Sequence, residues 1–79
     1  MKIEVRLFAN LADYLPPGTG GGTAILEVPA DTTLGELARG LAIPDELPRL
    51  MLVNGHDAAP DRRLAPGDVV SIFPPLAGG

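Results

Sequence analysis

The sequence of 79 residues predicts one α+β domain, in which a single main helix packs across a small sheet. Two observations lead to this fold class. Apolar and polar residues alternate with the period of a strand near both ends of the chain, whereas one central run has the spacing of a helix. The prolines and glycines gather between these runs, where they mark turns. We expect a single domain over residues 1–79, with residues 74–79 as a protruding C-terminal tail.

The first half of the chain predicts two strands joined by a short helix. In residues 2–8 apolar and charged side chains alternate, so they belong to opposite faces of a half-buried strand. Residues 9–15 carry leucines four positions apart, which predicts a short helix. The glycine-rich segment 18–22 lacks the lysine and the following helix of a phosphate-binding loop, so we expect a flexible connection. A second strand over residues 24–28 ends at Pro29.

The main helix is expected to begin at Thr33. This N-cap residue is followed three positions later by Glu36, which is the pattern of a capping box. One apolar stripe follows at helical spacing, formed by Leu34, Leu37, Ala38 and Leu41. Gly40 is a candidate C-cap, and Pro44 prevents the helix from continuing far.

A β-hairpin is expected next. The apolar run over residues 50–53 ends at Asn54-Gly55, the dipeptide that most strongly predicts a tight hairpin turn. Residues 56–59 can form a brief return strand, which Pro60 ends. With a final strand returning beside the first, this order of elements is that of an α+β roll.

The last strand is expected over residues 68–73. It follows a Pro-Gly turn, at which Asp68 fits turn chemistry better than calcium binding. By alternation Val70 and Ile72 share one face, and Phe73 lies on the other.

The composition excludes several classes of function. A net charge of −4 counts against nucleic-acid binding, and the absence of cysteine excludes disulfides and thiol nucleophiles. His56 has neither a cysteine nor a second histidine with which to share a metal, so we expect a turn residue and no metal site. No segment approaches the roughly 18–20 apolar residues of a membrane span, and no secretory segment follows Met1. We expect a cytoplasmic protein that binds neither membranes nor nucleic acid.

The C-terminal tail is the most informative segment. Pro74-Pro75 cannot extend a central ladder of hydrogen bonds, so the tail is expected to leave the sheet. Gly78-Gly79 has no Cβ atoms and can enter a narrow cleft. Six residues reach roughly 20 Å, so the Gly79 carboxylate can enter the active site of a partner while the folded body docks outside. Because no side-chain constellation looks catalytic, the reactive group is expected to be the C-terminus.

Three segments and the order of elements make the whole chain resemble the MoaD/ThiS family of ubiquitin-like sulfur carriers, and its MoaD branch most closely. The segments are Val53-Asn54-Gly55, Leu64-Ala65-Pro66-Gly67-Asp68 and Phe73-Pro74-Pro75-Leu76-Ala77-Gly78-Gly79. Phe8-Ala9 and Thr33-Leu34-Gly35-Glu36-Leu37 strengthen the resemblance. It implies the β-grasp fold, with a mixed sheet of four to five strands, one main helix across it and a short helix after the first strand.

The resemblance also implies a function. An ATP-dependent adenylating enzyme of the ubiquitin-activating type forms an acyl-adenylate on Gly79, and a sulfur donor (a sulfurtransferase or desulfurase) converts it to a thiocarboxylate. The large subunit of molybdopterin synthase then takes up the tail and transfers the sulfur to a pterin precursor of the molybdenum or tungsten cofactor. The chain itself is then the non-catalytic small subunit, binds no cofactor, and leaves the use of ATP to its partner.

The resemblance assigns roles to the residues of the tail. Gly79 carries the sulfur, and access to the partner's site depends on the residues before it, which are Gly78, Ala77, Leu76, Pro75 and Pro74. We expect Phe73 to be an exposed aromatic anchor for the partner, and Phe8 to lie in the core or at its edge. The chain departs from the family pattern at Ala12-Asp13, where an Arg-Glu pair is common, and at His56-Asp57, where an apolar residue is common. Both departures concern the docking partner.

Three alternatives to this function remain open from the sequence. The same tail fits a sulfur carrier for thiamin, cysteine or tRNA thiolation. It also fits a protein modifier that is joined through Gly79 to a target lysine. A non-covalent ubiquitin-like interaction module is the third, and it predicts that truncating the tail leaves function unchanged.

Overall fold

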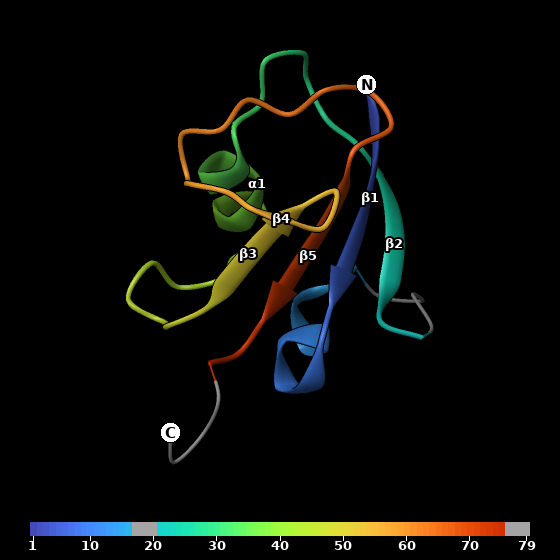
Figure 1. Cartoon of the computed structure of the whole chain (residues 1–79). Coiled ribbons are helices and arrows are strands. Elements are labelled where there is room, and N and C mark those ends of the chain that lie inside the picture. The colour runs from blue at the N-terminus through green and yellow to red at the C-terminus, as the bar shows by residue number, and fades with distance from the viewer. Residues whose placement is uncertain (17–20, 76–79) are drawn as a thin grey trace.

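The computed structural model describes residues 1–16 and 21–75 of the chain. The described elements follow one another as β1 (Lys2–Leu7), η1 (Ala9–Tyr14), β2 (Thr23–Glu27), α1 (Leu34–Gly40), β3 (Leu50–Val53), β4 (His56–Asp57) and β5 (Val69–Phe73). The strands form one mixed sheet in the order β2-β1-β5-β3-β4 (Figure 1). β1 and β5 are parallel, and the other neighbouring pairs are antiparallel. The predicted β-grasp fold is confirmed.

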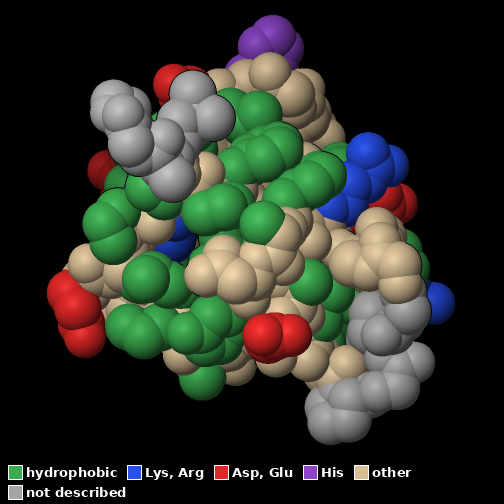
Figure 2. All heavy atoms as spheres, turned by 90° about the horizontal axis from the view of Figure 1, so that it is seen from below, with side chains coloured by type: hydrophobic (Ala, Val, Ile, Leu, Met, Phe, Trp, Pro, Cys, Tyr) green, Lys and Arg blue, Asp and Glu red, His purple; other side chains and the backbone are tan. Residues whose placement is uncertain are grey.

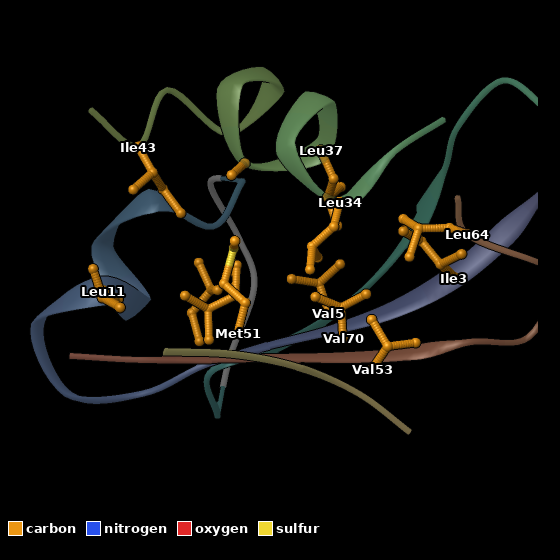
Figure 3. Packing of buried hydrophobic residues seen from close by; sticks show 13 residues of the cluster. Ile3, Val5, Leu11, Leu34, Leu37, Ile43, Met51, Val53, Leu64 and Val70 are labelled. Atoms are coloured by element: carbon orange, nitrogen blue, oxygen red, sulfur yellow. The ribbon is translucent and has the colours of Figure 1, made fainter. Parts of the chain in front are cut away.

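α1 covers one face of the sheet, and the core lies between them (Figure 3). Every second residue of the central strands points into this core, as the alternation predicts. The strands contribute Ile3, Val5, Leu7, Met51, Val53, Val70 and Ile72, and the rest of the described chain contributes Leu11, Leu34, Leu37, Ala38, Ile43 and Leu64. The other face of the sheet carries no helix of the described chain and is called the open face below (Figure 1).

The start of α1 is the predicted capping box. The Glu36 N–H donates to the Thr33 hydroxyl (3.2 Å), and the Thr33 N–H donates to the Glu36 carboxylate (2.8 Å). Two of the N–H groups that the first turn of a helix leaves unpaired are satisfied in this way. The capping box therefore positions Leu34 and Leu37 to face the sheet, where both are buried.

The end of α1 differs from the prediction. The helix ends at Gly40, with Leu41 as the C-cap, so Leu41 packs against the core from outside the helix. The left-handed residue that ends it is Ala42 (φ 65°), not Gly40. The Ala42 N–H donates to the Arg39 carbonyl and the Ile43 N–H to the Ala38 carbonyl, which is the Schellman arrangement. Because Ile43 is buried in the core, the C-cap lies one residue later than predicted, at Leu41 and not at Gly40.

The hairpin between β3 and β4 is confirmed. Asn54 (φ 53°) and Gly55 (φ 82°) are both left-handed, as the two central residues of a type I′ turn must be. The return strand is shorter than expected and covers only His56–Asp57.

Asp68 ties this hairpin to the start of β5 and confirms its predicted turn role. Asp68 is buried, with 8% of the residue exposed, and its carboxylate accepts from the Asn54 amide (3.0 Å) and the Ala65 N–H (2.8 Å). The Asn54 side-chain oxygen accepts in turn from the Val69 N–H (3.0 Å). All these groups are satisfied inside the fold, so Asp68 is structural.

The remaining boundaries differ little from those predicted. The first strand ends at Leu7, the short helix is a 3₁₀ helix that ends at Tyr14, and the second strand begins one residue early, at Thr23. The expected flexible connection over residues 18–22 lies largely outside the described part of the chain. Of its residues the structure describes Gly21 and Gly22, which both lie in a turn and have positive φ. No described helix has the length and apolar character that crossing a bilayer requires.

Candidate functional site

β5 fixes the point at which the C-terminal tail begins. The strand lies between β1 and β3 and ends at Phe73, directly before Pro74. At this end the Phe8 N–H donates to the Ile72 carbonyl (3.1 Å), and Leu50 pairs with Phe73 in the register of β3. Figure 1 shows β5 running out of the sheet at the end of the molecule away from the N-terminus. A strand held on both sides gives the tail a rigid origin.

The structure reaches only the first residues of the tail. Pro74 is half-buried and Pro75 is exposed, and neither belongs to a strand. The predicted roles of the last four residues fall outside the described part of the chain, at Leu76, Ala77, Gly78 and Gly79. Those roles stay predictions.

Phe8 and Phe73 stack on each other at the root of the tail. Their ring centroids are 4.2 Å apart and their planes differ by 9°. Phe8 is 40% exposed, so the expectation that it lies in the core or at its edge was wrong. The reason is its register. Leu7 points into the core and pairs with Ile72, so Phe8 comes to the open face beside Phe73.

Leu50 extends this pair across the sheet. It is 51% exposed, and its register partner on β5 is Phe73. Because Met51 and Val53 are buried, Leu50 lies on the open face. We call Phe8, Phe73 and Leu50 the apolar row. Figure 2, a view of this end from below, shows hydrophobic side chains gathered across it, with most charged groups toward the margin.

The apolar row has the character of a docking anchor. Large apolar side chains that are half-exposed and adjacent are typical of protein interfaces, where aromatic residues supply much of the binding energy. Phe73 is half-buried, because Phe8 covers one face of its ring. The sequence predicts Phe73 alone as an anchor. The alternation of buried residues in β1 and β3 was the signal that could have placed Phe8 and Leu50 beside it.

The surroundings of the Glu36 carboxylate are structural. Hydrogen bonds from the Thr33 backbone and hydroxyl lower the pKa of Glu36, whose carboxylate belongs to the capping box. Of the residues the structure places, no three His, Asp or Glu side chains gather as they would around a metal ion. His56, the turn histidine, is exposed on β4.

The two departures from the family pattern lie where a partner can reach them. Ala12 is half-buried and Asp13 exposed in η1, the helix that packs against the end of β5. His56 and Asp57 are exposed on β4, at the far edge of the sheet. They affect the surface and leave the core unchanged.

Comparison with known proteins decides the family. The sequence matches the ThiS family model over residues 5–79, which covers nearly all of the chain. The chain belongs to the ThiS family. No curated protein matches it, and the similarity to individual proteins comes from solved structures.

Three solved structures show how this ThiS family member relates to others. The HVO 2177 protein of Haloferax volcanii is 31% identical with a TM-score of 0.76, over 100% of this chain and 87% of that chain. SAMP1 of the same organism is 29% identical with a TM-score of 0.76, over 100% of both. A chain from the complex of subunits 1 and 2 of the molybdopterin-converting factor of Helicobacter pylori is 25% identical with a TM-score of 0.62, also over 100% of both.

The family narrows the function to two related kinds. The chain is a sulfur carrier of the ThiS/MoaD type or a small modifier of the SAMP type. The small carriers of the ThiS family are not catalytic by themselves and bind no cofactor.

Proposed function

We propose that this chain is a sulfur carrier of molybdopterin biosynthesis, which holds sulfur as a thiocarboxylate on Gly79. The observation that carries the proposal is the apolar row at the root of a Gly-Gly tail: an anchor for a partner lies directly where the reactive arm begins. The similarity to a chain of the Helicobacter pylori molybdopterin-converting factor complex favours this pathway.

The chemistry explains why the carrier needs no catalytic side chain. A carboxylate is a poor acyl donor until one of its oxygens becomes part of a leaving group. A ubiquitin-activating-type enzyme supplies this by transferring AMP from ATP to the Gly79 carboxylate, with release of pyrophosphate. The persulfide of a sulfurtransferase or desulfurase then displaces AMP to form an acyl disulfide, and a thiol reductant cleaves this disulfide to leave the thiocarboxylate. Both steps need a site from which water is excluded, and the partner provides it. The carrier contributes proximity by delivering its terminus.

The position of β5 fits a carrier that delivers its C-terminus to the active site of a partner. When a partner docks on Phe8, Phe73 and Leu50, the start of the tail is fixed against it. Residues 74–79 then span roughly 20 Å from that point, which is far enough to reach a buried active site. We expect the adenylating enzyme and the large synthase subunit to use this apolar row in turn, in the cytoplasm.

Reconstitution with purified components tests the proposal. The protein is incubated with its adenylating enzyme, ATP and a sulfur source, and the intact mass is measured. We expect the gain of one sulfur for one oxygen in the wild type and in Ala77→Gly, the matched control. Deletion of Gly79, or Gly78→Leu, is expected to abolish the gain while the far-ultraviolet circular dichroism stays that of the wild type. A deletion variant that still gains sulfur contradicts the proposal.

The second candidate function is protein modification. It is favoured by the 28–29% identity to small archaeal modifier protein 1 over most or all of both chains. In that case Gly79 ends in an isopeptide bond to a lysine of a target protein. Blots of extracts from the source cells distinguish the two. Conjugates of higher mass that vanish in a Gly79 deletion support the modifier, whereas a thiocarboxylated free form without conjugates supports the carrier.

The molecule that accepts the sulfur distinguishes molybdopterin synthesis from the other sulfur pathways. If the chain serves molybdopterin synthesis, its thiocarboxylate form is expected to convert the pterin precursor when mixed with the large synthase subunit of the same organism. A thiocarboxylate that supports thiamin, cysteine or tRNA thiolation but leaves the pterin precursor unchanged overturns this assignment and keeps the carrier chemistry.

A further inference from the structure

Arg49 is a basic side chain that the fold partly encloses, and it directly precedes Leu50 of the apolar row. The chain has six lysines and arginines, all of them among the described residues, and the other five are exposed. Enclosing part of a charged side chain costs free energy, which a carboxylate partner usually offsets. A half-buried arginine therefore indicates a specific set of contacts.

Arg49 forms no ion pair with any carboxylate that the structure describes. The described ion pairs engage three other cations: Arg6 with Glu4, Arg39 with Asp45, and the N-terminal ammonium with Glu27. Glu46 lies in the same loop as Arg49 but is exposed and does not pair with it. Attraction between opposite charges therefore does not explain the position of Arg49.

Two backbone carbonyls hold the Arg49 guanidinium. Its Nη1 donates to the carbonyl oxygens of Pro44 (2.8 Å) and Leu47 (3.2 Å), in the loop between α1 and β3. Pro44 and Pro48 have no N–H, and the Leu47 N–H donates within the loop, to the Pro44 carbonyl (3.0 Å). The Arg49 side chain thus clamps the loop at the point where it leads into β3.

This clamp leaves one donor of Arg49 without an acceptor. Nε is buried and has no hydrogen-bond partner in the described chain. A buried donor without an acceptor lowers stability, and an apolar side chain of similar length would avoid this cost. A local cost of this kind is expected chiefly at positions that serve function.

The first residue of β3 is where the clamp has an effect. β4 pairs with Leu52 and Val53 and does not extend to Leu50, so Leu50 is paired with β5 alone, through Phe73. The Leu50 side chain is exposed, so little packing fixes it. A strand end that is held from one side opens more easily than the middle of a sheet. Because Arg49 fixes the backbone directly before Leu50, it keeps Leu50 beside Phe73.

We propose that Arg49 is a positioning residue of the docking surface, which clamps the loop before β3 and so holds Leu50 in the apolar row. Its effect on a partner is exerted through Leu50. A row that is already in place when the partner arrives reduces the cost of ordering side chains on binding. The inference rests on the docking role of the apolar row, which belongs to the proposed function.

Nuclear magnetic resonance on the full-length protein alone tests the clamp. Leu50 and Phe73 are register partners, so we expect nuclear Overhauser effects between the Leu50 methyl groups and the Phe73 ring in the wild type. Arg49→Met keeps most of the side-chain length without the donors, and it is expected to reduce these effects by at least about half while those within the core remain. Arg62→Met, the matched control, removes an exposed arginine and is expected to change neither.

The affinity for the large synthase subunit of the same organism tests the consequence. Arg49→Met is expected to weaken binding about fivefold. Arg49→Lys is expected to weaken it about twofold, because its shorter side chain keeps the charge and reaches one carbonyl but not both. Arg62→Met is expected to bind as the wild type does.

A double-mutant cycle with Leu50→Ser separates positioning from general stability. If Arg49 acts through Leu50, Arg49→Met has no further effect on affinity in the Leu50→Ser background. If Arg49 only stabilises the fold, the same fivefold loss is expected in both backgrounds. Circular dichroism verifies that each variant is folded, and Arg49→Lys replaces Arg49→Met in both measurements if the latter does not fold.

Three results would overturn the inference. The first is an unchanged set of Leu50–Phe73 effects in Arg49→Met, the second an affinity of that variant equal to the wild type, and the third a full loss in the Leu50→Ser background. Failure of the proposed function gives different results, namely a wild type that does not bind the subunit or a Gly79 deletion that still gains sulfur. In either case the measurement on the free protein still decides whether Arg49 holds Leu50 beside Phe73.

Discussion

At the scale of single residues, Gly22 and Gly40 show what a missing side chain does in this fold. Gly22 has a φ of +73°, and a Cβ on it would lie 2.9 Å from the Leu7 carbonyl oxygen. Its own carbonyl accepts the Leu7 N–H, so it must approach β1 this closely. Gly40 ends α1 with no such φ, and a Cβ there would meet nothing within 4 Å.

We therefore expect opposite effects from the same substitution at these two positions. Gly22→Ala is predicted to lower the free energy of unfolding by about 1–3 kcal/mol, through left-handed strain and the contact with β1. Gly40→Ala is predicted to raise it by about 0.5–1 kcal/mol, because alanine loses less backbone entropy in a helix. Urea unfolding followed by circular dichroism measures both. Equal stabilities would show that the turn before β2 is not as described.

The apolar row can be tested at Leu50, with Ile25 as the matched control. Both are large exposed apolar residues on the open face, but only Leu50 adjoins Phe73. Leu50→Ser is predicted to weaken binding of the large synthase subunit roughly tenfold, as expected for an interface anchor. Ile25→Ser is predicted to leave it unchanged. Calorimetric titration gives both affinities, and equal losses would argue against the apolar row as the docking surface.

At the scale of the elements, α1 is held in place by its two ends. The capping box at Thr33 could be predicted because it is a local pattern of two residue types at fixed spacing. The other end could not be placed from Gly40, because burial of Ile43 outweighs the preference for glycine and forces Ala42 into the left-handed region. Phe8 was misplaced for a related reason, since its position depends on the register of β1 against β5.

The capping box predicts a pH dependence of stability. Hydrogen bonds from Thr33 lower the pKa of Glu36 in the folded protein below its ordinary value of 4.5. The ionised group therefore stabilises the fold fully above about pH 5.5, and this contribution is lost as pH falls through the lower, folded pKa. Glu36→Gln is expected to reduce stability at pH 7 and to equal the wild type near the acid limit. A stability difference that is constant between these conditions contradicts the prediction.

At the scale of the whole molecule, the fold separates two surfaces. The apolar row occupies the end of the sheet where β5 leads into the tail, and β2 forms one edge of the sheet. The α+β class could be predicted from strand and helix periods and turn residues, which mark each element, and the resemblance to a known family implied the β-grasp fold. The sequence also predicts roles for Phe73 and the tail, which are contiguous in the chain, and those roles stay predictions. Leu50 and Phe8 are brought to Phe73 by strand pairing, which no local pattern records.

The central claim is that the Gly79 carboxylate carries sulfur, and the intact mass of the protein from its own cells tests it most directly. We predict a fraction that is heavier by the difference between one sulfur and one oxygen. Fragmentation is expected to place this difference on the C-terminal glycine, and deleting the adenylating enzyme is expected to remove it. A protein that carries only a free carboxylate while the pathway is active, or extra mass on a side chain, would contradict the claim.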